Sequence, residues 1–268
     1  SGTHAITTAL FGVLRPGDRM VSLTGAPYDT LQPVIGVVPG GHGSLREFGI
    51  QYEQLDLCAD GTPDYKNVAK AIRGARAAYI QRSRGYTLRE SLHIDEISRL
   101  IDAVRAADPD TVVIVDNCYG EFVETHEPIE CGADLIAGSL IKNPGGGLAK
   151  IGGYIAGKES LVARCGYRLT APGIGKEAGA SLNSLQEMYQ GFFLAPHVVS
   201  QSLKGALFTS LLLEKMNVRT KPRYDVPRTD LIQTVEFDTK EQMIQFCQSI
   251  QQASPINAHF KPEPASMP

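Results

Sequence analysis

The sequence alternates between short apolar runs and amphipathic stripes, and this alternation constrains the fold more than any other feature. A helical stripe at Ile6, Leu10, Val13 and Leu14 ends at a Pro-Gly-Asp breaker, and a second stripe covers 94–104. Strand-like runs separate the helical segments, at 19–23, 51–57, 77–81, 111–116, 133–139 and 153–156. Strands that alternate with helices predict an α/β fold with a mainly parallel sheet flanked by helices on both faces.

The later part of the chain predicts a second, smaller α/β unit. The stretch 178–216 is mostly helical in pattern, with a break expected around Pro196. A strand over 231–237 and a helix over 240–253 follow it, and a further helical stretch is expected earlier, at 64–72. A chain of 268 residues is near the length at which one core gives way to two. We therefore predict a large domain over 1–205 and a partial small domain over 206–268.

Composition excludes several classes of function. A net charge of −3 gives no basic field for nucleic acid, and no run of eighteen apolar residues predicts a membrane span. Five widely spaced cysteines without a CxxC pair favour free thiols in a reducing cytoplasm over disulfides or zinc, and we predict no metal. The chain begins at Ser1, without a methionine or a secretory leader, and ends in the proline-rich 262–268. We expect sequence to be missing at both ends.

Ligands of parallel sheets bind at the carboxyl ends of the strands, and an acid and a lysine stand at two such ends. Asp116 ends the most apolar run, where it either caps a turn or keeps the nitrogen of a pyridine cofactor protonated. Lys142 follows Ser139 in the string SLIKNPGGG and precedes a glycine-rich turn that would let a ligand approach the backbone. It is either a surface lysine or the amine of a Schiff base.

Other candidate residues lie near the same edge. Gly2 and Thr3 open the first helix, whose amides could bind a phosphate together with the Ser139 hydroxyl, although alone they indicate only a cap. Tyr28 could stack on a flat cofactor ring or pack in a loop. Arg82 and Arg84 follow a strand and suit a substrate carboxylate or cofactor oxygens, and a solvated pair is about equally expected.

Two short motifs offer rival interpretations. Ser139 and Lys142 match SxxK of serine acyl-enzymes, but that motif requires a serine on a helix and companion SDN and KTG strings, which the sequence lacks. Residues 173–178 match GxGxxA, a dinucleotide fingerprint, but no apolar strand precedes them.

The order of these candidates resembles that of fold-type I enzymes dependent on pyridoxal 5'-phosphate (PLP). More narrowly, the chain resembles the methionine γ-lyase-like family, also described as cystathionine β-lyase-related aluminium-resistance proteins. The resemblance covers essentially the whole chain, and its matching strings are SGTHAI at 1, GAPYDTL at 25, GSLREFGI at 43, IQRSRGY at 80, VDNCYGEFVE at 115, GADLIAGSLIKNPGGG at 132 and GGY at 152.

The resemblance implies a role for each residue. Lys142 would hold PLP as a Schiff base and move the substrate's Cα proton, and Asp116 would pair with the pyridine nitrogen. Tyr28 would stack on the ring and take part in catalysis. The phosphate would bind Gly2, Thr3 and Ser139. Arg84 is a candidate for the substrate, although the family's arginine for the substrate carboxylate is expected beyond this sequence.

The resemblance also implies an activity and an assembly. We expect β- or γ-elimination on a small sulfur-containing amino acid such as methionine, cystathionine or cysteine, in a homodimer or homotetramer. Transamination, aldol cleavage or a non-catalytic PLP-fold binding module remain alternatives.

Overall fold

The computed structural model describes residues 1–38, 42–87, 89–171, 173–179, 181 and 183–265. They form two compact units. The first comprises Ser1–Leu203 together with the short segment Pro227–Leu231, and the second comprises Lys204–Val226 together with the residues from Ile232 onward. The domain boundary expected after residue 205 stays a prediction, and residues 266–268 of the predicted small domain lie outside the described part of the chain.

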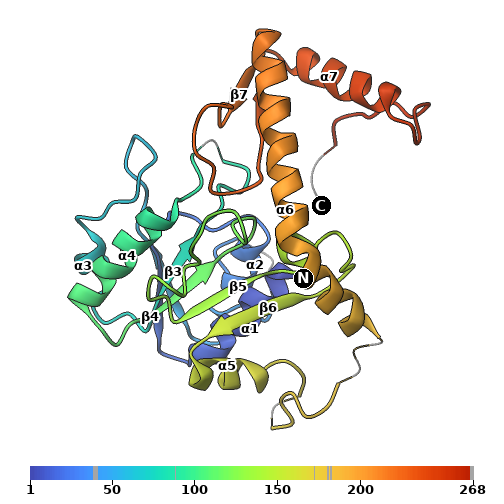
Figure 1. Cartoon of the computed structure of the whole chain (residues 1–268). Helices are drawn as coiled ribbons and strands as arrows, with labels where there is room; N and C mark the ends of the chain where they lie inside the picture. The colour runs from blue at the N-terminus through green and yellow to red at the C-terminus, as the bar shows by residue number, and fades with distance from the viewer. Residues whose placement is uncertain (39–41, 88, 172, 180, 182, 266–268) are drawn as a thin grey trace. The chain divides into compact units, whose positions relative to one another are not determined.

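The first unit is built on a six-stranded sheet in the order β2-β1-β3-β4-β5-β6, of which Figure 1 labels β3, β4, β5 and β6. Neighbouring strands are parallel except for β6, which pairs antiparallel with β5. The strands are β1 Arg19–Ser22, β2 Gln51–Gln54, β3 Ala77–Gln81, β4 Val112–Asp116, β5 Leu135–Ser139 and β6 Gly153–Gly157. The three central strands β3, β4 and β5 are buried at every position, as expected for a parallel sheet covered on both faces. The predicted mainly parallel sheet is confirmed.

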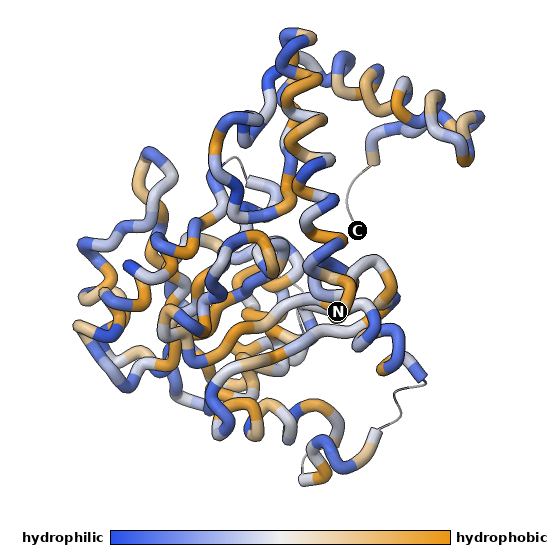
Figure 2. The backbone as a smooth tube through the Cα atoms, viewed as in Figure 1, coloured by the Kyte–Doolittle hydropathy of each residue, from blue (hydrophilic) through white to orange (hydrophobic). Residues whose placement is uncertain are grey.

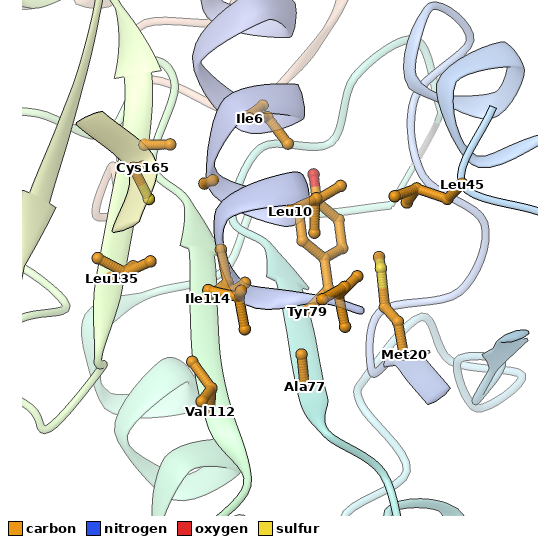
Figure 3. Packing of buried hydrophobic residues seen from close by; sticks show 14 of the residues in the cluster. Ile6, Leu10, Met20, Leu45, Ala77, Tyr79, Val112, Ile114, Leu135 and Cys165 are labelled. Carbon is orange, nitrogen blue, oxygen red and sulfur yellow. The ribbon is translucent and has the colours of Figure 1, made fainter. Parts of the chain in front are cut away.

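Helices cover the two faces of this sheet and form two separate cores. The core on one face includes residues of α1 and α5 with Ala77, Tyr79 and Ile114 of the strands (Figure 3). The core on the other face includes residues of α3 and α4 with Ala78 and Ile80. The helices of this unit are α1 Gly2–Val13, α2 Leu31–Ile35, α3 Val68–Ala71, α4 Ile94–Ala107, α5 Glu159–Gly166, the 3₁₀ turn η1 Asn143–Gly145 and the first part of α6 Ser184–Lys215.

The alternation of side chains along each strand determines which polar residues share a face. Ile114 of β4 and Ala137 of β5 belong to the core beneath α1. Asp116 and Ser139 stand two positions further along the same strands, so their side chains point to the same face. The fold therefore places both residues at the carboxyl edge of the sheet, on the side of α1.

Two sequence-based expectations were wrong in detail. The helical stretch expected over 64–72 is a helix only at α3, Val68–Ala71. The break expected around Pro196 does not occur, because α6, Ser184–Lys215, runs through this proline. A proline removes one hydrogen bond from the ladder, and a helix of 32 residues keeps the others. Residues 180 and 182 of the stretch expected to be helical lie outside the described residues.

The second unit contains a short antiparallel pair and one helix besides the end of α6. The pair is β7 Arg219–Lys221 with β8 Thr234–Glu236, so the strand expected over 231–237 is shorter and β7 was not predicted. Helix α7, Lys240–Ala253, has the expected bounds, because Thr239 and Gln242 form a capping box at its start. None of its residues is buried, and Figure 2 shows hydrophobic and hydrophilic residues interspersed along it.

Candidate cofactor site

The N-terminus of α1 presents two amides that have no acceptor among the described residues. Ser1 accepts the amide of His4 with its hydroxyl at 3.5 Å and the amide of Ala5 with its carbonyl at 3.1 Å. The first four N–H groups of a helix have no intrahelical acceptor unless a cap supplies one. The amides of Gly2 and Thr3 are therefore available, at the positive end of a helix of 12 residues.

Ser139 lies against this helix end and has an unsatisfied hydroxyl. A Cβ added to Gly2 would lie 3.0 Å from the Cβ of Ser139 and 3.4 Å from the Sγ of Cys118, so glycine allows the close approach. The Ser139 Oγ is buried and finds no hydrogen-bond partner among the described residues. A buried hydroxyl without a partner costs about 1–3 kcal/mol, and an anion beside it would remove that cost. The residues present therefore fit the phosphate of PLP.

Asp116 is buried at the next strand end and is held by two donors. The amide of Cys118 donates to its Oδ1 at 3.1 Å, and the hydroxyl of Tyr79 donates to its Oδ2 at 3.3 Å. Burial raises the pKa of Asp116, while the hydrogen bonds and the charge of Lys142 oppose that rise. A cation such as a protonated pyridine nitrogen would lower this pKa again. Sequence analysis missed Tyr79, which the alternation along β3 could have revealed.

Lys142 is partly buried in the loop that follows β5. Its Nζ lies 4.0 Å from the centroid of the Tyr119 ring. Burial lowers the pKa of Lys142, and the facing Cys118, Tyr119 and Asp116 raise it by more, so the pKa lies above its ordinary value. Each of Asp116 and Lys142 thus shifts the pKa of the other. The structure therefore places the predicted acid and the predicted amine close enough for their charges to interact.

Tyr28 connects the helix end to the loop that follows β1. Its hydroxyl donates to Thr3 at 3.0 Å, and its backbone amide donates to the side chain of Gln81 at 2.8 Å. Burial, and next the charge of Asp116, raise the pKa of its phenol. Tyr28 therefore belongs to the same group of residues as Gly2, Ser139, Asp116 and Lys142.

The two arginines after β3 differ from this group, because both pair with carboxylates of the protein. Arg82 is fully buried and donates to Asn117 Oδ1 at 2.8 Å and to Glu124 Oε2 at 2.7 Å. Arg84 is 2% exposed and donates to Glu90 at 3.0 Å. The alternative of a solvated pair is therefore wrong for both, because each guanidinium is almost fully buried and pairs with a carboxylate, Glu124 for Arg82 and the exposed Glu90 for Arg84. The role of Arg84 toward a substrate stays a prediction.

The rival motifs do not have the context that they need. Ser139 ends strand β5 and does not lie on a helix, as the SxxK interpretation requires. Residues 173–178 form turns and bends, without the strand-to-helix passage of a dinucleotide site. Among the described residues there is no cluster of His, Cys, Asp and Glu that could hold a metal ion, and no helix with the length and apolar character needed to cross a membrane.

Known proteins are similar to this chain. The chain is 61% identical over its whole length to the Bacillus subtilis protein YnbB and spans 64% of that relative. A solved structure from Listeria monocytogenes has a TM-score of 0.96 and 58% identity, covering all of this chain and 66% of that one. The chain thus spans slightly less than two thirds of these relatives.

Three further proteins carry names that indicate chemistry. The solved structure of a carbon-sulfur lyase involved in aluminum resistance, from Clostridium novyi, has a TM-score of 0.93 and 47% identity, covering 99% of this chain and 64% of that one. The L-methionine gamma-lyase of Treponema denticola is 26% identical over 60% of this chain and 36% of its own length. The PLP-dependent Escherichia coli protein YhfS, at 18% identity and a TM-score of 0.67, shares the fold and covers 97% of this chain and 66% of its own.

The family model that describes methionine gamma-lyase matches residues 1–268. The chain therefore belongs to the methionine gamma-lyase family.

Proposed function

We propose that this chain is the cofactor-binding part of a PLP-dependent carbon–sulfur lyase that acts on a small sulfur-containing amino acid. One observation carries the proposal: the buried hydroxyl of Ser139, which has no partner among the described residues, lies against the free N-terminus of α1. The coupled pair of Asp116 and Lys142 at the same edge supports it. Arrangements that leave polar groups unsatisfied are rare in native proteins and point to a bound partner.

Each part of the cofactor would meet a particular group of the chain. The amides of Gly2 and Thr3 and the hydroxyl of Ser139 would bind the phosphate. Tyr28 would cover a face of the ring, and Asp116 would receive the hydrogen bond of the pyridine nitrogen. When bound through Lys142, PLP supplies a sink for the electron pair released at the substrate's Cα.

The chain's own residues would then manage protons and orientation. Asp116 would keep the facing nitrogen protonated, since an ionised carboxylate is most stable beside a cation. The amine of Lys142, once freed by the substrate, would take the Cα proton and later return a proton. Tyr28, fixed by Thr3 and Gln81, would keep the ring from tilting. A thiol would leave from Cβ or Cγ of the substrate, and the remainder would be hydrolysed to a 2-oxo acid and ammonia.

Attachment of the cofactor tests the proposal directly. PLP is added to the chain, the adduct is reduced with borohydride, and the modified residue is located by mass spectrometry. We expect modification at Lys142, together with a visible absorbance band that Lys142→Ala removes. Lys150→Ala is the matched control, because Lys150 is exposed and pairs only with Glu187 among the described residues. Labelling that spreads over surface lysines and persists in Lys142→Ala would reject the proposed function.

Products distinguish the remaining reactions. A C–S lyase would release a thiol and a 2-oxo acid from methionine, cystathionine or cysteine, whereas a transaminase would release no thiol, and aldol cleavage would release an aldehyde. A binding module would form the visible band without turnover. We further propose a homodimer or homotetramer, testable by light scattering, and a cytoplasmic location, which the five free cysteines favour.

A further inference from the structure

Lys142 has an aromatic neighbour that the proposed mechanism does not use. The Nζ of Lys142 lies 4.0 Å from the centroid of Tyr119, over the face of the ring. The face of an aromatic ring is electron-rich and attracts an ammonium ion, but it has no comparable attraction for a neutral amine. The position of Tyr119 therefore favours the protonated form of Lys142 over the form that attacks a carbonyl.

The backbone of Tyr119 adopts a conformation that needs support. Its φ of 72° lies in the left-handed region, which residues other than glycine adopt rarely. The amide of Gly120 donates to the carbonyl of Asn117 at 3.0 Å and closes the turn. Such outliers persist where the surrounding structure holds them, and they cluster at functional sites.

The support comes from the residue next to the lysine. Asn143 donates its side-chain amide to the carbonyl of Tyr119 at 2.9 Å and to the carbonyl of Glu121 at 3.0 Å. Asn143 is buried and begins the turn η1 directly after Lys142. One side chain therefore ties the loop of the lysine to the turn of the tyrosine, and so keeps the amine over the ring.

We propose that Tyr119 is a positioning residue whose ring holds the ammonium of Lys142 after the lysine has removed the Cα proton. In that step the Cα–H bond breaks, the proton moves to Nζ, and the electron pair stays with the substrate and cofactor. The ring stabilises the new charge and keeps the proton close until Lys142 returns it. This inference rests on the proposed function.

The titration of Lys142 in the cofactor-free chain tests this role. The rate of acetylation of Lys142 by acetic anhydride is measured against pH by mass spectrometry, in the unchanged chain and in Tyr119→Phe and Tyr119→Leu. The midpoint of each profile reports the pKa of the amine, and the plateau reports its accessibility. Cys118 and Asp116 also face Lys142 and are kept in all three chains.

We expect Tyr119→Leu to lower the midpoint by about half a pH unit, which makes the amine roughly threefold more reactive below it. Tyr119→Phe keeps the ring but loses the hydroxyl, which also raises the pKa of Lys142, so its midpoint should lie between those of the unchanged chain and Tyr119→Leu. The exposed Lys150 serves as the internal reference. Equal midpoints in all three chains, or a Phe variant that behaves like Leu, would overturn the role of the ring.

Borohydride reduction with PLP separates the two proposals. An adduct on Lys142 with unshifted midpoints would remove the role of Tyr119 and leave the proposed function intact. A missing adduct would reject the proposed function, and with it the reaction for which Tyr119 positions the lysine.

Discussion

Two buried polar clusters lie near the carboxyl ends of strands in the same sheet, and they differ in how far their polar atoms are paired. The arginine cluster consists of Arg82, Glu124 and Thr229, and the ligand cluster consists of Asp116, Ser139 and Lys142. In the arginine cluster the carboxylate Oε2 of Glu124 accepts from Arg82 and from Thr229, each at 2.7 Å. In the ligand cluster Ser139 finds no partner among the described residues, and burial raises the pKa of Asp116.

The pairing of polar atoms distinguishes a cluster that stabilises the fold from a cluster that could bind a ligand. Both clusters contain charged residues that are almost fully buried, so burial alone does not mark a site. When every buried polar group in a cluster has a partner within the protein, no group is left to bind a ligand. When some buried polar groups lack a partner, they lower the stability of the ligand-free fold but can bind a ligand. The interpretation of Arg82 as a ligand for a substrate carboxylate is thereby replaced by a structural role.

The largest effect is expected at the arginine cluster. Arg82→Met would leave the carboxylate of Glu124 without its cation, and we expect the free energy of unfolding to fall by about 3–5 kcal/mol. Urea denaturation measures this change. Lys150→Met is the control, because Lys150 pairs with Glu187 at the surface, and it should leave the midpoint unchanged. A small loss in Arg82→Met would mean that the two clusters are not as different as their hydrogen bonds indicate.

The corresponding change in the ligand cluster should spare stability and remove function. Asp116→Asn keeps an acceptor for the amide of Cys118 and removes the negative charge beside the proposed pyridine nitrogen. We expect turnover to fall by roughly 10²-fold, the usual loss for one electrostatic partner of a transition state. Thermal unfolding of the cofactor-free chain should show equal or greater stability. Normal turnover by the Asn variant would exclude Asp116 as the partner of the ring.

Glu121 is only partly paired, which is intermediate between the two clusters, and its pKa lies in a range that solution experiments can reach. Its Oε1 accepts from Tyr154 at 2.8 Å, its Oε2 has no partner among the described residues, and burial raises its pKa to about 8. The folded chain therefore holds a proton that the unfolded chain releases above its ordinary pKa near 4.5. The stabilisation is complete below that value and declines as pH rises toward 8.

Glu121→Gln cannot titrate, so the unchanged chain should lose stability relative to this variant as pH rises between 5 and 8. The difference should change by up to about 1.4 kcal/mol for each pH unit. Urea denaturation at pH 5, 6, 7 and 8 gives the difference, and parallel curves for the two chains would show that Glu121 does not carry a raised pKa.

The smallest effects are expected for Ser139→Ala, which should not lower the stability of the cofactor-free chain but should weaken the binding of PLP. Ser139→Ala removes the unpaired hydroxyl, so the cofactor-free chain should be equally stable or slightly more stable. The same variant loses one hydrogen bond to the proposed phosphate, and the Kd for PLP should rise about tenfold. Calorimetry and fluorescence titration measure the two effects separately. If Ser139→Ala lowered the stability of the chain and left the affinity for PLP unchanged, Ser139 would have a structural role like that of the arginine cluster.

Local patterns were sufficient for much of the fold. The bounds of α7 and the strand ending at Asp116 follow from a capping box and from an apolar run, both of which lie within a few residues. The mainly parallel sheet follows from the alternation of these patterns. The two units were expected from length and pattern, and the boundary between them remains a prediction.

Contacts between distant residues could not be read from the sequence. Arg82 meets Glu124, which is 42 positions away, and Thr229, which is 147 positions away, so no local signal reveals that its charge is compensated. The continuity of α6 through Pro196 was missed for a different reason, because a proline lowers the stability of a helix without always ending it. Helix and strand ends alone predict that Gly2, Asp116 and Ser139 lie near one edge of the sheet, and the roles of these residues toward a cofactor remain predictions.

The segment Pro227–Leu231 has a consequence for any attempt to divide the molecule. It belongs to the first unit, although residues of the second unit precede and follow it along the chain. A protein that stops after residue 205 would lack Thr229, which donates to Glu124, and Asp230, which contacts Ser91. The first unit is thus completed by residues that follow much of the second unit along the chain. A fragment that ended at the predicted boundary would leave buried polar groups of the first unit without their partners.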